Sequence, residues 1–183
     1  MDGRGRGYRY VGPADLAAAV RRPGREGRAI RSADDLDDWL SEQPAPERLE
    51  PFTFVVDLAG GLRLAPRRSE HVACAGGGDE GDEGDGGGTA RVLGAGEMTF
   101  GREAGRWVVT EVSNQSTGYC PDVSSWPAVA AAVERAEVAH PGGYTYEVVF
   151  RRCPGCGEIG IVREGDFVCV FCGGDLPKVW NVG

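Results

Sequence analysis

Apolar residues recur at helical spacing in two parts of the chain. Leu36, Trp39 and Leu40 fall on one face of a helix, and Ser32 followed by Asp35 has the spacing of a capping box at its start. A similar apolar stripe follows residue 125, and a proline opens a shorter segment at residue 13. These patterns predict helices over residues 13–22, 32–43 and 125–138.

Between these helical segments, runs of β-branched and aromatic residues are separated by turns that contain glycine. The first two runs meet at Gly60 and Gly61, and a later pair meets at residues 101–105. The strands follow one another without intervening helices, which favours antiparallel pairing. We therefore predict an α+β fold in which an antiparallel β-sheet carries two or three helices. The strands are expected over residues 52–58, 62–66, 70–75, 89–100, 106–113 and 144–151.

Two segments have compositions that do not favour packed structure. Residues 76–88 contain only Gly, Asp and Glu. Burial cannot offset the entropy of ordering them, so a disordered acidic loop is predicted, and its spacing does not fit an EF-hand calcium loop. Residues 1–12 are rich in Arg and Gly and are expected to form a flexible basic tail. The rest divides into an α+β body over 13–150 and a C-terminal unit over 151–183.

Four cysteines in the C-terminal unit have the spacing of metal ligands. Cys153 and Cys156 form one C-x-x-C pair, Cys169 and Cys172 form a second, and twelve residues separate the pairs. Four thiolates in this arrangement can surround one Zn²⁺ tetrahedrally, and such a closed site is structural rather than catalytic. Disulfides and a redox C-x-x-C motif are the alternatives.

The segment between the two cysteine pairs predicts a hairpin of residues 158–163 and 166–170 around Glu164 and Gly165. This layout resembles the zinc ribbon family over about residues 150–175, with structural Zn²⁺ as the cofactor. The C-terminal unit is therefore interpreted as a zinc ribbon followed by a tail. Residues 176–180 are expected to fold back onto the protein, because an exposed Val-Trp pair would leave a large apolar surface in water.

A second group of chemically capable residues lies in the middle of the chain. Residues 94–97 read Gly-Ala-Gly-Glu on one predicted strand, and the loop of residues 114–121 follows the next strand. The pair resembles a Gly-x-Gly-Glu strand with an Asn-x-Ser-Gly-x-Tyr-x-Pro loop of uncharacterised bacterial proteins and toxin-associated modules. This chain departs from that pattern at Thr117, inserted before Gly118, and at Cys120, which follows the tyrosine. The resemblance implies no specific activity.

If the protein is an enzyme, this second group supplies its site. Glu97 would be the general base, while Asn114, Ser116 and Tyr119 would orient a nucleotide-like or small polar substrate, with His71 nearby. The alternative is structural. Asn and Ser side chains in turns commonly bond their own backbone, and the glycines of the strand are typical of a β-bulge.

Composition and charge narrow the function classes. The 183 residues carry a net charge of −8, which argues against a general nucleic-acid binder or a protein of anionic membrane surfaces. No run approaches the ~20 apolar residues of a membrane span, and the N-terminus lacks a signal-peptide core, so a cytoplasmic protein is expected. Lys178 is the single lysine, which we interpret as the codon usage of a GC-rich bacterial gene.

The function predicted from these features is that of a bacterial, zinc-binding, non-enzymatic protein that binds a protein or peptide. An acidic surface fits a basic protein or peptide better than a nucleic acid, which remains the weaker choice of partner. The alternative hypothesis is the small enzyme whose site is built around Glu97 and residues 114–119.

Overall fold

The computed structural model describes residues 6–20, 26–75 and 91–183. The acidic loop predicted over residues 76–88 lies outside these described residues.

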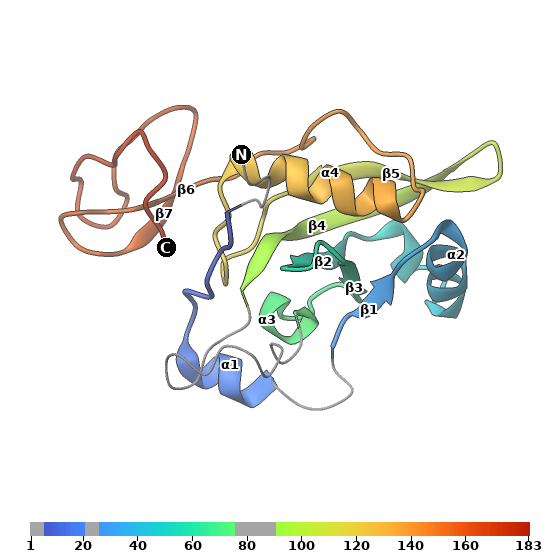
Figure 1. Cartoon of the computed structure of the whole chain (residues 1–183). Coiled ribbons are helices and arrows are strands. Elements are labelled where there is room, and N and C mark those ends of the chain that lie inside the picture. The colour runs from blue at the N-terminus through green and yellow to red at the C-terminus, as the bar shows by residue number, and fades with distance from the viewer. Residues whose placement is uncertain (1–5, 21–25, 76–90) are drawn as a thin grey trace.

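Within the described ranges, five strands form one antiparallel sheet in the order β1-β3-β2-β4-β5, and two further strands form a separate antiparallel pair. The predicted α+β class with an antiparallel sheet is confirmed (Figure 1). The strands of the main sheet are β1 (Arg28–Ile30), β2 (Phe52–Asp57), β3 (Leu62–Ala65), β4 (Val92–Glu103) and β5 (Arg106–Ser113), and the separate pair is β6 (Val149–Arg152) and β7 (Ile159–Val162).

Four α-helices and two 3₁₀ turns are assigned in the described residues. The cap of α2 has the predicted basis, because the Ser32 hydroxyl accepts the N–H of Asp35 at 3.1 Å and the Asp35 carboxylate accepts the N–H of Arg31 at 2.9 Å. The helices are α1 (Ala14–Val20), α2 (Ala33–Glu42), α3 (His71–Cys74) and α4 (Trp126–Arg135), and the 3₁₀ turns are η1 (Glu47–Leu49) and η2 (Val123–Ser125).

Each face of the main sheet has its own core. On one face, Phe52, Phe54 and Met98 pack against α2 and α4, and on the other, Val55 and Ala95 pack against α1 and α3. The pairing of β2 with β4 places Phe54 opposite Gly96 and Val55 opposite Ala95, so the two faces alternate along both strands. Figure 1 shows α4 across one face and α1 with α3 on the other, while the β6–β7 lobe lies to one side.

The strand expected over residues 70–75 is wrong, because this segment forms the short helix α3. The N–H groups of Ala73 and Cys74 both donate to the carbonyl of Glu70, which closes a helical turn. A short apolar run is compatible with either a strand or a helix, so its pattern alone could not decide. Cys74 is buried, and its thiol faces the Arg63 carbonyl at 3.7 Å.

The turn expected over residues 101–105 is shorter than predicted. Strand β4 continues to Glu103, and only Ala104 and Gly105 form the turn, both with positive φ (48° and 82°). Positive φ at both central residues matches the right-handed twist of the strands that a two-residue hairpin joins. The strand expected over residues 144–151 begins only at Val149, although Tyr146 forms an isolated bridge to Ser113.

Residues 6–12, expected to belong to a flexible basic tail, instead pack against the main sheet. Tyr8 is buried and exchanges backbone hydrogen bonds of 2.7 and 3.1 Å with Val92. The N–H of Val11 donates to the Gly118 carbonyl at 2.7 Å. Arg6 also contacts the C-terminal segment, since its guanidinium lies 5.0 Å from the centre of the Trp180 ring.

Replacement of Gly96 by alanine is expected to destabilise the protein by about 3 kcal/mol, the upper end of overpacking costs. A Cβ on Gly96 would lie 1.9 Å from the Ser113 carbonyl oxygen of β5, so β4 and the edge strand β5 would have to separate. Urea denaturation measures the change. Gly142→Ala is the matched control, since a Cβ there meets nothing within 4 Å, and it should change stability by less than about 0.5 kcal/mol. Equal stabilities of the two variants would contradict the close strand approach.

Candidate metal centre

The four sulfur atoms predicted to bind metal lie together at one end of the ribbon. The Sγ atoms of Cys153, Cys156, Cys169 and Cys172 are all within 4.8 Å of one another. The Cys153–Cys172 and Cys156–Cys169 sulfur pairs are 3.6 and 3.7 Å apart. Metal–sulfur bonds of about 2.3 Å in a tetrahedron require sulfur atoms about 3.8 Å apart, whereas a disulfide requires about 2.05 Å. The cluster therefore has the size of a tetrahedral metal site.

Two backbone turns of the same construction hold these sulfurs, and we call them the first knuckle (residues 153–158) and the second knuckle (residues 169–174). In each knuckle, the glycine after the second cysteine donates its N–H to the carbonyl of the first cysteine at 2.8 Å. The first cysteine donates to the carbonyl five residues later, again at 2.8 Å. Gly157 and Gly173 have φ of 78° and 73°, the left-handed region that favours glycine.

The strands of the ribbon differ from the predicted hairpin. Strand β7 pairs with β6, and residues 166–170 form only isolated bridges, between Arg163 and Asp166 and between Val168 and Asp175. The two-residue turn at Glu164 and Gly165 is present, and both residues have positive φ. Residues 167 and 169 instead bond to the chain after the second knuckle, because the N–H of Leu176 donates to the Phe167 carbonyl at 2.7 Å and the N–H of Cys169 donates to the Gly174 carbonyl at 2.8 Å.

Electrostatics around the thiols favours a bound cation. The N–H of Cys156 lowers the pKa of the Cys153 thiol to about 7, and the N–H of Gly155 acts in the same direction. The N–H of Glu158 lowers the pKa of Cys156, but desolvation and the neighbouring thiols outweigh it and raise that pKa to about 12. Clustered thiolates repel one another, so all four ionise together only when a metal cation compensates their charge.

The buried Arg151 fastens the ribbon to the chain that follows it. Its guanidinium donates to the carbonyls of Pro177 at 3.0 Å, Lys178 at 2.8 Å and Phe150 at 2.7 Å. Arg151 lies two residues before the ligand Cys153 on the same strand-to-knuckle segment. The three carbonyls satisfy a buried cation without a carboxylate partner, so the side chain serves structure rather than phosphate binding.

The C-terminal segment folds back onto the body as predicted, but only Trp180 of its Val-Trp pair is partly covered, and Val179 stays 77% exposed. The Trp180 indole N–H donates to the Cys120 carbonyl at 2.9 Å, and its ring meets Tyr8 edge-on at 5.3 Å. Val182 is buried beside Phe150. The segment thus joins the ribbon to the sheet of the body.

The loop residues of the second predicted group are buried and bonded to backbone. The Asn114 side chain donates to the carbonyls of Pro121 at 2.9 Å and Val148 at 2.8 Å, and accepts the N–H of Val148 at 2.7 Å. The Ser116 hydroxyl accepts the N–H of Tyr119 at 3.4 Å. Both side chains are at most 1% exposed, so they are placed to fix the loop and not to meet a substrate.

The other members of that group lie on one face of the sheet. Tyr119 is fully buried in the core on the α1–α3 face, and Glu97 is half-buried opposite Ser113. The His71 Nε2 lies 2.9 Å from the Gly96 carbonyl oxygen. The geometry supports the structural interpretation of these residues.

The glycines of β4 likewise serve packing. A Cβ on Gly94 would lie 2.7 Å from a methyl group of Val129 on α4, and Gly96 approaches the neighbouring strand closely. Helix α4 and strand β5, not a ligand, occupy the space that these glycines leave free.

Acid is expected to weaken the fold through His71. Burial lowers the pKa of His71 below its ordinary 6.5, although the bond to the Gly96 carbonyl opposes the shift. Below pH 6.5 the unfolded chain gains a proton at His71 before the folded protein does, so the free energy of unfolding falls as the pH falls. Urea denaturation across this range measures the fall. The variant His71→Gln should show a smaller loss, and equal losses in both proteins would contradict this assignment.

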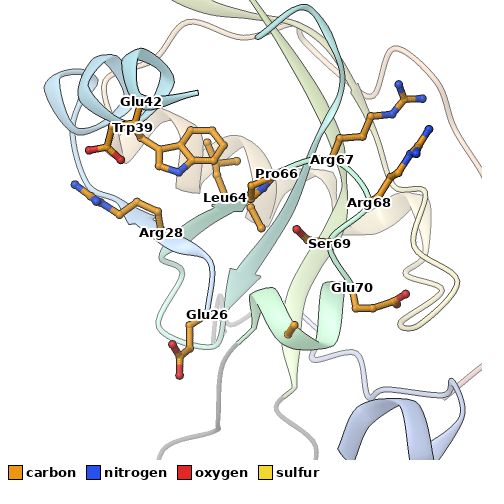
Figure 2. A pocket seen from close by; sticks show the side chains of 12 residues that line it. Glu26, Arg28, Trp39, Glu42, Leu64, Pro66, Arg67, Arg68, Ser69 and Glu70 are labelled. Carbon is orange, nitrogen blue, oxygen red and sulfur yellow. The ribbon is translucent and has the colours of Figure 1, made fainter. Parts of the chain in front are cut away.

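A cavity of about 530 Å³ lies between α2, the end of β3 and α3, and the residues along its wall include Glu70 and Ala73 beside His71 but none of the residues predicted from the sequence to form a site. Its floor includes Trp39, Leu64 and Pro66. Figure 2 shows Arg28 on one side and Arg68 on the other, with their charged ends pointing apart. The cavity therefore offers an apolar hollow with a charged rim but no convergent catalytic set.

Comparison of the chain with family models, curated proteins and solved structures finds no match. Among the described residues, no helix has the length and apolar content needed to cross a membrane. The metal centre is thus the best-defined functional feature of the described structure. Sequence reasoning identified its ligands but passed over the apolar residues of the second knuckle, Val170 and Phe171, although their position between two ligands is visible in the sequence.

Proposed function

We propose that this chain is a zinc-binding, non-enzymatic protein of bacterial type that binds a protein or peptide partner through a zinc ribbon. The observation that carries the proposal is the cluster of four cysteine sulfurs at tetrahedral spacing. Four thiolates suit Zn²⁺ because this ion binds cysteine sulfur readily and is tetrahedral in structural sites. Such a site leaves no coordination position for a substrate, so the metal holds a binding surface in shape rather than catalysing a reaction.

A reducing compartment such as the cytoplasm belongs to the proposal. All six cysteines are free thiols in the structure, and the four ligands must stay reduced to hold metal. The enzyme alternative has less support, because Asn114, Ser116 and Tyr119 are buried among bonds and core contacts instead of facing a common pocket.

Metal analysis of protein purified under reducing conditions without chelator tests the zinc site. One zinc per chain is expected, and none in the double variant Cys156→Ser, Cys172→Ser. The conservative variant Arg163→Gln, at an exposed ribbon position that supplies no ligand, should keep its zinc. A metal-free wild-type protein would end the zinc assignment.

Affinity purification from the native host tests the binding role. A stoichiometric partner should accompany the wild-type chain and be lost from the metal-free double variant. If no partner is recovered and the protein turns over a small polar substrate, the enzyme hypothesis replaces the binding role.

A further inference from the structure

One part of the ribbon exposes several large apolar side chains to solvent. Val168, Val170 and Phe171 are 42%, 73% and 62% exposed, in and just before the second knuckle. We call these three residues, with the flanking Asp166 and Asp175, the second-knuckle surface. Three exposed apolar side chains so close together mark an interaction site better than single exposed residues, which are ordinary on protein surfaces.

The local backbone explains why these side chains face outward. In the extended segment before the second knuckle, Phe167 and Cys169 point inward, where Phe167 meets Lys178 and Cys169 supplies a metal ligand. Asp166 and Val168 alternate with them and are exposed. Asp175 pairs across from Val168 and is also exposed, so both carboxylates flank the apolar residues.

Charge distinguishes the partners that this surface can accept. Asp166 and Asp175 form no ion pair with another described residue, and four thiolates on a divalent metal add a charge of −2 beside the exposed Cys172. Two exposed cations of the described residues lie near these carboxylates: Arg163, which pairs with Asp166 along the backbone, and Lys178, whose Nζ lies 3.7 Å from the centre of the Phe167 ring. Their two charges do not offset both carboxylates and the metal cluster. The surface is therefore apolar at its centre and anionic overall.

From these observations we infer that the second-knuckle surface binds a basic, amphipathic segment of another protein, with Phe171 as its apolar anchor. The inference rests on the proposed zinc-ribbon function and names the partner's chemistry. Lys or Arg side chains of the partner would face Asp166 and Asp175 while an apolar side chain covers Val170 and Phe171. A second copy of the chain would bring the same negative charges together, and a nucleic acid would be repelled by them, so neither fits.

Selection from a library of random linear peptides displayed on phage tests the inference. The bait is the full-length, zinc-loaded protein. Phage that also bind the double variant Val170→Ser, Phe171→Ser are discarded, because their peptides do not depend on these two apolar residues. Peptides rich in Lys or Arg with at least one large apolar residue are expected. Enrichment of acidic peptides, or no peptide that depends on these residues, would overturn the inference.

Fluorescence anisotropy with a selected peptide then measures affinity. The double variant should bind roughly tenfold more weakly, the factor that follows when about 1.4 kcal/mol of apolar burial is lost. Leu49→Ser is the matched control, because Leu49 is 80% exposed on η1 and lies outside the surface, and it should bind like wild type. Asp166→Asn, Asp175→Asn should weaken binding at low salt and have little effect at high salt.

Two further measurements separate this inference from the function on which it rests. The serine variant should still contain one zinc, so a loss of binding reports on the surface and not on the metal. Wild-type protein without zinc would contradict the proposed function itself. Sedimentation that shows self-association abolished by the serine variant, or salt-dependent nucleic-acid binding abolished by it, would overturn the choice of a basic protein segment.

Discussion

Removal of the metal is expected to unfold the ribbon while the main sheet remains folded. Metal coordination by Cys₄ sites couples about 10–16 kcal/mol of apparent binding free energy to folding at neutral pH. Apolar packing near the ligands is slight, since the described cluster there consists of Cys153, Val162, Cys169 and Leu176 with two partly buried neighbours. The contacts of Phe150 and Arg151 join β6 to the C-terminal segment and do not hold the two knuckles together. Both knuckles place ligand sulfurs within that core, so loss of metal leaves like-charged or desolvated thiols at its centre.

Hydrogen exchange before and after treatment with a chelator measures this outcome. The amides of β6, β7 and both knuckles should lose protection, whereas those of β2 and β4 should keep most of theirs. The amide of Val11 serves as an internal control for the body, because it donates to the Gly118 carbonyl there. If the ribbon amides stay protected without metal, the small apolar core is enough to keep the ribbon folded and the prediction is wrong.

Replacement of Asn114 by alanine is expected to cost about 3–5 kcal/mol of stability. The side chain satisfies three buried backbone groups of Pro121 and Val148, and each buried group left without a partner costs about 1–3 kcal/mol. Urea denaturation gives the change directly. Gln115→Ala is the control, because Gln115 is exposed and its backbone N–H, not its side chain, makes the local bond to Ser113.

The same variant distinguishes structure from catalysis. If Asn114→Ala keeps its stability but loses activity on a small polar substrate, the result favours the enzyme hypothesis. A large loss of stability with no activity in either protein supports the structural role.

The amino-acid sequence predicts those parts of the fold in which local chemistry decides the outcome. The Ser32 cap, the Gly60-Gly61 turn and the four metal ligands each depend on residues close in sequence or on a fixed ligand spacing. Strand β1 is not predicted because three residues carry too little pattern. Helix α3 is predicted as a strand because its short run of one histidine and three apolar residues is compatible with either conformation. Both are decided by packing against distant residues.

The loop after β5 and the N-terminal segment are harder to predict from the sequence. The sequence could not tell whether the polar loop after β5 faces water or backbone, since Asn114 finds its partners 34 residues away at Val148. The position of Tyr8 depends likewise on Val92 and Trp180. Residue type alone cannot show which of these groups is buried when its partner comes from another part of the chain.

The sheet edges have a consequence for aggregation. A free edge strand offers unpaired N–H and C=O groups on which another chain can build, as in fibril growth. The outer edge of β5 is covered at two points, because Val108 and Ser113 form bridges to Ala139 and Tyr146. On the opposite side, β1 is only three residues long and begins with the exposed Arg28. Within the described structure, the main sheet is therefore a poor template for fibrils, and the protein can expose an apolar ribbon without also exposing a long strand that would seed them.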